Sequence, residues 1–158
     1  MFIPTHCDGC SKTALVAELS ITGGMAQCAE CGGTMRVLPG ESYSEDDIPL
    51  FNDLCAALDE VGLSQKHAAG LAAQLEIRRT QPPGHGLRQL AQVLPSLGIL
   101  ELIVANRATT LRKAESMLAT LLGVVVAGRR PQSGLLSRPS GISTKDDETN
   151  TDERSQTG

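Results

Sequence analysis

The spacing of apolar residues divides the chain into three regions. Residues 14–19 form a largely apolar run that suits a short strand, and residues 35–38 form a second one after a glycine turn. Between residues 48 and 127 the apolar positions recur every three or four residues, which is helical spacing. The pattern predicts an α+β fold with a small β unit at residues 1–40, a mostly α-helical domain at 41–130 and a polar, disordered tail at 131–158.

The first predicted helix lies between Pro49 and Gly62. Proline lacks a backbone N–H and fits only the first turn of a helix, which makes Asp46 or Asp47 a better N-cap than Ser44. Gly62 is typical of the residue that ends a helix in a left-handed conformation. We therefore expect the acidic cluster to serve the helix start rather than a metal or a reaction.

Several more helical segments follow in the pattern. Ser64 is expected to cap a helix that stops before Pro82, and residues 87–94 suggest a short third helix. Residues 97–104 are apolar nearly all round and suit either a helix or a strand. The clearest helix covers residues 110–127, and its apolar stripe is expected to pack in the core or to form a homodimer.

Charge and aromatic content weaken the case for nucleic-acid binding without removing it. The 158-residue chain has a net charge of -4 and three aromatic residues, so stacking side chains are scarce. Its charge is uneven, because residues 41–75 hold seven acids and one base whereas residues 76–130 hold eight bases and three acids. The opposite charges of the two segments could pair with each other within the chain, or the basic segment could bind a partner.

Two cysteine pairs carry the strongest chemical signal in the sequence. Cys7 and Cys10 form one Cys-x-x-Cys pair, and Cys28 and Cys31 form another. Each pair can wrap one side of a metal ion, and four thiolates suit tetrahedral Zn²⁺. With four protein ligands the ion has no open position for water or substrate, so the predicted site is structural.

The first quarter of the chain resembles a zinc ribbon. The resemblance rests on the four cysteines, on Gly9 before the second ligand, and on Gly32 and Gly33 after the fourth. Glycines there allow tight turns that aim backbone N–H groups at the sulfurs. Zinc ribbons are small recognition or scaffolding modules, so the resemblance implies binding rather than catalysis and leaves the partner open.

The remaining cysteine and the N-terminus favour a reduced, cytoplasmic setting. Cys55 lies in a helical apolar stripe and suits a buried small side chain. No basic and apolar signal stretch precedes Cys7, and the apolar stretch at residues 116–128 is too short to span a membrane. A redox function of the Cys-x-x-Cys pairs is the second alternative to the function we favour.

The sequence favours a non-catalytic adaptor or regulator that acts through protein contacts. His67 and His85 have no suitably spaced partners, and no phosphate-binding loop, nucleophile elbow or metalloprotease motif is present, so we expect no enzyme. The first alternative is a DNA-binding regulator, because the two helices around Gly62 resemble a helix-turn-helix in outline. The bases that would meet phosphates are Arg78, Arg79, Arg88, Arg107, Arg112, Lys113, Arg129 and Arg130.

Overall fold

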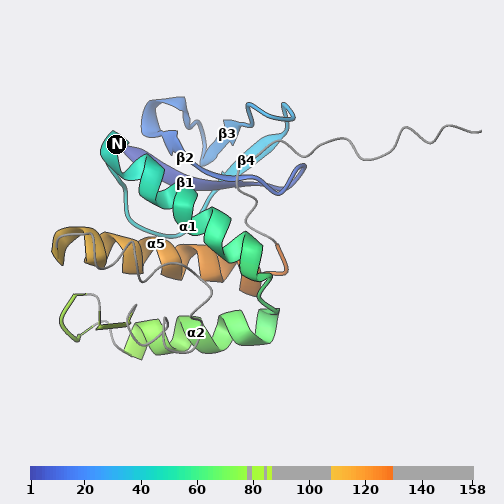
Figure 1. Cartoon of the computed structure of the whole chain (residues 1–158). Coiled ribbons are helices and arrows are strands. Elements are labelled where there is room, and N and C mark those ends of the chain that lie inside the picture. Colours follow the sequence, from blue (N-terminus) through green and yellow to red (C-terminus); the bar gives the residue numbers. More distant parts are fainter. Residues whose placement is uncertain (78–79, 84, 87–107, 130–158) are drawn as a thin grey trace, which may run out of the picture.

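A small antiparallel sheet lies against a group of helices (Figure 1). The computed structural model describes residues 1–77, 80–83, 85–86 and 108–129. These residues form four strands followed by three α-helices, which confirms the α+β prediction. The predicted helix at 87–94, the ambiguous segment at 97–104 and the predicted tail at 131–158 lie outside the described residues.

The sheet has the strand order β2-β1-β4-β3 and is antiparallel throughout. The two predicted strands are present as β2 (Thr13–Ala17) and β4 (Thr34–Val37). Sequence reasoning missed β1 (Phe2–Cys7) and β3 (Met25–Gln27). β1 contains a proline and buries polar residues, and β3 has three residues, so neither shows the alternation that marks a half-buried strand.

Strand register decides which side chains share a face of the sheet. Cys7 pairs with Met35, and Met35 also pairs with Ala26, so these three residues lie on one face. Together with Cys28 they form a small cluster of buried residues. Leu15 belongs to the other face and joins the larger core made with the helices.

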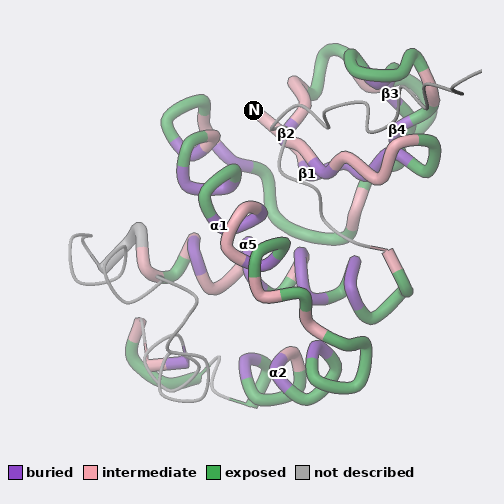
Figure 2. Tube along the Cα trace, turned by 45° about the vertical axis from the view of Figure 1, so that its right-hand side comes forward, coloured by how far each residue is buried: buried purple, intermediate pink, exposed green. Residues whose placement is uncertain are grey.

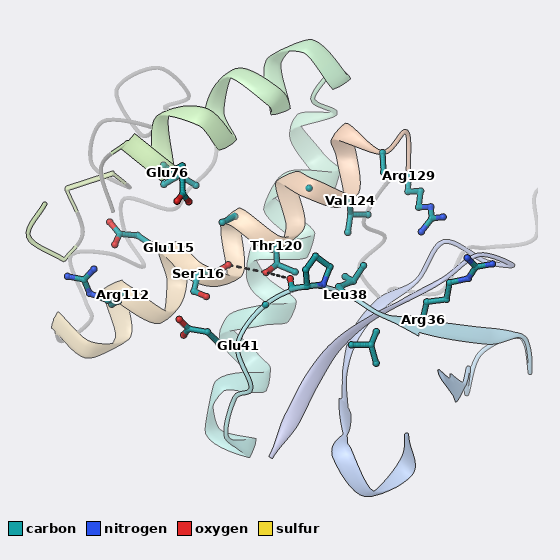
Figure 3. A pocket seen from close by; sticks show the side chains of 17 residues that line it. Arg36, Leu38, Glu41, Glu76, Arg112, Glu115, Ser116, Thr120, Val124 and Arg129 are labelled. Carbon is teal, nitrogen blue, oxygen red and sulfur yellow. Dashed lines mark hydrogen bonds between the residues drawn. The ribbon is translucent and has the colours of Figure 1, made fainter. Parts of the chain in front are cut away.

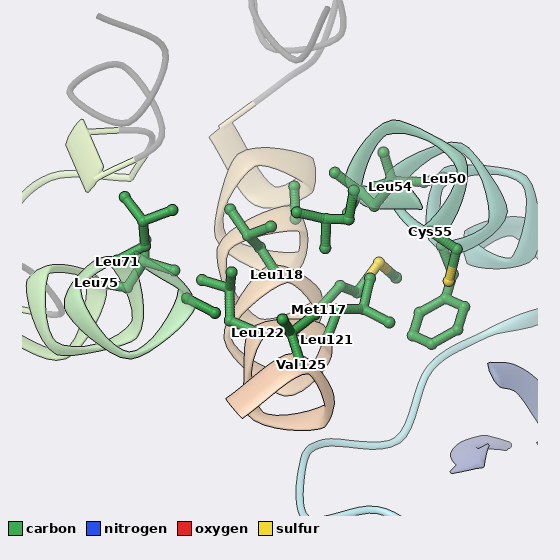
Figure 4. Close-up of a cluster of buried hydrophobic side chains, with 14 of the residues drawn as sticks. Leu50, Leu54, Cys55, Leu71, Leu75, Met117, Leu118, Leu121, Leu122 and Val125 are labelled. Carbon is green, nitrogen blue, oxygen red and sulfur yellow. The ribbon is translucent and has the colours of Figure 1, made fainter. Parts of the chain in front are cut away.

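The helices are α1 (Ile48–Val61), α2 (Gln65–Ile77) and α5 (Ala108–Val126). α5 lies between α1 and α2, and buried positions recur along all three helices (Figure 2). Met117, Leu118, Leu121 and Leu122 of α5 are at most 1% exposed and fill the space between its neighbours (Figure 4). Burial of each such side chain contributes roughly 1.5–3 kcal/mol, so α5 organises the helical core.

The helix predicted at 110–127 is confirmed, and its stripe is buried within the chain. A homodimer of the kind we predicted would have to use another surface of α5, and it stays a prediction. Among the described residues no helix combines the length and the apolar character that crossing a bilayer requires.

The ends of the helices lie where local sequence chemistry predicts them. Asp47 is the N-cap residue of α1, as predicted, and a 3-10 turn, Glu45–Asp47, that begins after Ser44 precedes the helix. The backbone N–H and Oγ of Ser44 donate hydrogen bonds to Oδ2 of Asp47, at 2.8 and 2.7 Å. Gly62 ends α1 with φ 61°, and Ser64 Oγ accepts a hydrogen bond from the N–H of His67 at 3.3 Å, as predicted.

Asp47 also links the start of α1 to α5. Its carboxylate accepts hydrogen bonds of 2.9 Å on both oxygens from Nζ of Lys113, and its side chain is 9% exposed. Burial alone would raise the pKa of Asp47, but Lys113 and Ser44 outweigh burial and hold the pKa below its ordinary value of 3.8. This pair is one instance of the charge compensation predicted between residues 41–75 and 76–130.

Replacement of Asp47 by alanine should lower the free energy of unfolding by about 1–3 kcal/mol at neutral pH, because charged hydrogen bonds are lost in a buried place. Since the pKa is depressed by folding, this stabilisation is present above the unfolded pKa and is lost as pH falls through the folded pKa. Urea unfolding at pH 7 and at strongly acidic pH measures both effects. The exposed neighbour variant Asp46→Ala should stay within about 0.5 kcal/mol of the wild type, and an equal loss in both variants would contradict this account.

Candidate metal centre

The fold brings both cysteine pairs to one place. Cys7 ends β1 and Cys10 lies in the turn that follows, while Cys28 follows β3 and Cys31 lies in the turn before β4. All four Sγ atoms lie within 4.8 Å of one another. The prediction that the two pairs meet is confirmed, and the cluster is a candidate site for a metal ion.

The spacing of the sulfurs fits tetrahedral coordination. The Sγ atoms of Cys7 and Cys31 are 3.5 Å apart, and those of Cys10 and Cys28 are 3.6 Å apart. A tetrahedron with metal–sulfur bonds of about 2.3 Å has edges of about 3.8 Å. A tetrahedral set of four sulfur donors is typical of zinc or of iron. The donors therefore support a metal ion and favour these two elements.

Burial differs sharply among the four cysteines. Cys7 is 0% exposed and Cys28 is 1% exposed, Cys10 is partly buried, and Cys31 is exposed. The two buried cysteines belong to the small cluster formed with Ala26 and Met35. The candidate centre is therefore buried against the sheet at Cys7 and Cys28 and open to solvent at Cys31.

Glycines close the site where a side chain would crowd it. A Cβ atom on Gly33 would lie 3.1 Å from Sγ of Cys31, and one on Gly9 would lie 3.4 Å from the same atom. The N–H of Gly33 donates a hydrogen bond to that sulfur at 3.4 Å, and Gly32 adopts φ 71°. Gly9, Gly32 and Gly33 thus have the steric and conformational roles expected from the resemblance to zinc ribbons.

The pKa values of two of the thiols also indicate that the site suits a cation. Burial opposes ionisation of Cys28, but the backbone N–H groups of Cys31 and Glu30 and two neighbouring thiols lower its pKa to about 7. At Cys10 the backbone N–H of Lys12 favours the thiolate, yet burial and the other three cysteines outweigh it and raise the pKa to about 12. Cys28 therefore ionises far more readily than Cys10, and a bound cation would supply the charge that favours the thiolate form of its ligands.

Ion pairs join the two cysteine turns to each other and to α5. Lys12 in the first turn pairs with Glu30 in the second. Asp8, between the first two cysteines, receives Nε of Arg36 at 2.7 Å and a guanidinium nitrogen of Arg129 at 3.3 Å. Such exposed pairs contribute roughly 0–1 kcal/mol each to stability. Their main effect is to position the turn at residues 7–10, which we call the metal turn, beside the C-terminal end of α5.

His6 does not join the cysteines, as expected. Side chains alternate along a strand, so His6 lies on the face opposite Cys7. The His6 side chain is buried, with Nδ1 2.8 Å from Oγ1 of Thr13, and Nε2 has no hydrogen-bond partner among the described residues. Burial first, and then the charge of Arg129, lower the pKa of His6, so the neutral imidazole is favoured at neutral pH.

A groove of about 890 Å³ runs beside the metal turn, between the sheet and the helices. Residues 36–41 form one wall, α5 forms the other, and Leu75 and Glu76 of α2 contribute at one side. The sequence signal that could have found it is the fourfold spacing of small residues, with Ala119 and Gly123 in α5 and Ala127 directly after it. Figure 3 shows Glu41, Glu76, Glu115 and Arg112 toward one end and Arg36 and Arg129 toward the other.

The eight bases of the DNA-binding alternative are not brought together within the described residues. Arg78, Arg79, Arg88, Arg107 and Arg130 lie outside that part of the chain. Lys113 pairs with Asp47 and Arg129 pairs with Asp8. Arg112 lies in the first turns of α5 and Arg129 follows its C-terminal end, so a basic DNA-binding face stays a prediction.

Comparison of the chain with protein-family models, with curated proteins and with solved structures found no match. The cysteine cluster therefore defines the protein only as a candidate metal-binding protein of zinc-ribbon-like character.

The variant Cys28→Ser should lose most of its bound metal and unfold the sheet, because it removes a buried donor and a member of the small cluster. The helical signal in far-ultraviolet circular dichroism should largely remain. Cys55→Ala is the matched control, since Cys55 is buried in the helical core away from the cluster. One full equivalent of metal in Cys28→Ser would refute a four-cysteine site.

Proposed function

We propose that this protein is a non-catalytic adaptor in which the four cysteines hold one structural Zn²⁺ ion and a neighbouring groove binds a segment of another protein. The observation that carries the proposal is the cluster of four sulfurs, whose first turn is tied to the groove because Asp8 pairs with Arg36 and Arg129 of the groove lining. Zinc is favoured over iron in this proposal because the chain resembles a zinc ribbon and because Zn²⁺ takes four thiolates without redox chemistry.

The metal turn and the groove share structural elements. β4 follows Cys31 within three residues and continues into residues 36–41, which form the groove wall. Arg36 lines the groove and pairs with Asp8 between the first two cysteines. A metal that fixes the cysteine turns would therefore also fix this wall, so we infer that binding in the groove depends on the metal.

The chemistry of the groove indicates its occupant. Val37, Leu38 and Pro39 face Ala119 and Val124 across the groove and offer apolar contact. Among the described residues that line the groove, one end carries the carboxylates of Glu41, Glu76 and Glu115 and the guanidinium of Arg112. Charge complementarity therefore favours an extended polypeptide with apolar side chains followed by a lysine or arginine at the acidic end. The same acidic excess disfavours a phosphate backbone there.

Selection of displayed random peptides against the metal-loaded protein tests this function. Enriched peptides should contain apolar residues followed by a basic residue, and Gly123→Phe should weaken their binding at least about tenfold by filling the groove. Gly123 is exposed, and no heavy atom lies within 4 Å of the position its Cβ would take, so the bulk can be added on the groove side.

Gly70→Phe is the matched control, because Gly70 is an exposed helical glycine with open space around it that does not line the groove. It should bind the selected peptides as the wild type does. Peptides unaffected by Gly123→Phe, or salt-sensitive binding of DNA in place of peptides, would contradict the proposal.

A further inference from the structure

The four cysteines differ in exposure, and two close sulfur–sulfur contacts cross from one turn to the other. Cys31 is exposed and Cys10 is partly buried, whereas Cys7 and Cys28 are buried. The 3.5 Å contact joins exposed Cys31 to buried Cys7, and the 3.6 Å contact joins Cys10 to Cys28. Each contact thus links one accessible sulfur with one shielded sulfur, and each crosses from one Cys-x-x-Cys turn to the other.

We propose that Cys31 is a site of oxidation by hydroperoxides, with Cys7 as the residue that resolves it. The result is a disulfide across the two turns that takes the place of the metal. This inference concerns regulation of the cysteine site and rests on the proposed metal centre. It differs from a thioredoxin-like reaction, in which the bond would form within one Cys-x-x-Cys pair.

Cys31 is exposed, and Gly9 and Gly33 have no side chains that could cover its sulfur. Gly9 and Gly33 each place a backbone without a side chain within reach of Sγ of Cys31, and Gly32 follows Cys31 in the chain. A small peroxide can therefore approach this sulfur from solvent. Cys7 is buried, and its Sγ lies 3.5 Å from Sγ of Cys31, close enough to attack that sulfur once it is oxidised.

The reaction balances with the peroxide as the only oxidant. The Cys31 thiolate attacks one peroxide oxygen, the O–O bond breaks, and a sulfenic acid and hydroxide form. The Cys7 thiolate then attacks the sulfenic sulfur, the S–O bond breaks, and the disulfide and a second hydroxide form. Two thiolates lose two electrons in total, and the metal loses half of its ligands.

The consequence of this pairing is that oxidation need not separate the two turns. A Cys7–Cys31 bond would connect β1 with the turn before β4, the same segments that the metal would connect. The sulfurs must approach from 3.5 Å to the bonded distance of about 2.05 Å. Bonds within the two pairs would instead release each turn from the other.

Peptide mapping after limited oxidation tests the pairing in the full wild-type chain. The metal content of the sample is measured first, one molar equivalent of hydrogen peroxide is added, and free thiols are then blocked. Trypsin cuts after Lys12 and Arg36, so residues 1–12 carry one cysteine pair and residues 13–36 carry the other. We expect the two peptides to become cross-linked as metal is released, in about tenfold excess over peptides with internal disulfides.

A second digestion identifies the bonded cysteines. Cleavage before Asp8 separates Cys7 from Cys10, and cleavage after Glu30 separates Cys28 from Cys31. The first product should join Cys7 with Cys31. Cys55, 1% exposed, should stay unmodified, and Cys55→Ala should follow the same course as the wild type.

The outcomes separate the two proposals. Internal disulfides within each pair, or oxidation of Cys31 to the sulfinic acid without a disulfide, would overturn the pairing and leave the metal centre standing. A sample that contains no metal yet forms the Cys7–Cys31 bond would contradict the proposed metal centre and support the pairing.

Discussion

The sheet depends on the mutual approach of four cysteine sulfurs. Its own buried cluster consists of Cys7, Ala26, Cys28 and Met35, so two of its four buried members are the thiols themselves. Thiols this close cannot all ionise without a cation, and the pKa of about 12 at Cys10 expresses that cost. A bound divalent ion would remove the cost and cross-link the turns, and metal binding of this kind contributes on the order of 10 kcal/mol in zinc-finger peptides.

The helical part makes a different kind of core, and a few polar contacts set the sheet against it. α5 buries apolar side chains toward both α1 and α2 and needs no metal to do so. Tyr43 forms a backbone bridge with Phe2, and its hydroxyl donates to Oγ of Ser116 on α5 at 3.0 Å. Together with the pairing of Asp8 with Arg129, these contacts place the metal turn at one end of the groove. They connect the cysteine site of the sheet to the apolar core of the helices.

Patterns with strong local causes were predictable from sequence. The cysteine spacing predicted the cluster, Gly62 and Ser64 predicted the helix ends, and the stripe of α5 predicted its burial. β1 and β3 were missed because pairing with neighbouring strands, rather than their own alternation, makes them strands. Asp47 was predictable as the N-cap of α1, but the 3-10 turn before it was not, because Asp47 turns back to Ser44 and across to Lys113, and the Lys113 contact spans 66 residues of sequence.

The groove could not be derived from sequence for a related reason. Its walls come from residues 36–41 and from α5, which meet only after the sheet has packed on the helices. The close approach of the linker to α5 at Gly40, where a Cβ would lie 2.8 Å from Oγ1 of Thr120, depends on the same packing. Small residues on α5 were visible in the sequence, but nothing there showed what would face them.

X-ray absorption spectroscopy of the natively purified protein tests the central claim most directly, because it reports the element and its ligands together. The account predicts one zinc ion per chain surrounded by four sulfur atoms at about 2.3 Å. Nitrogen or oxygen ligands in place of any sulfur, iron in place of zinc, or a protein that folds its sheet with no metal would contradict it.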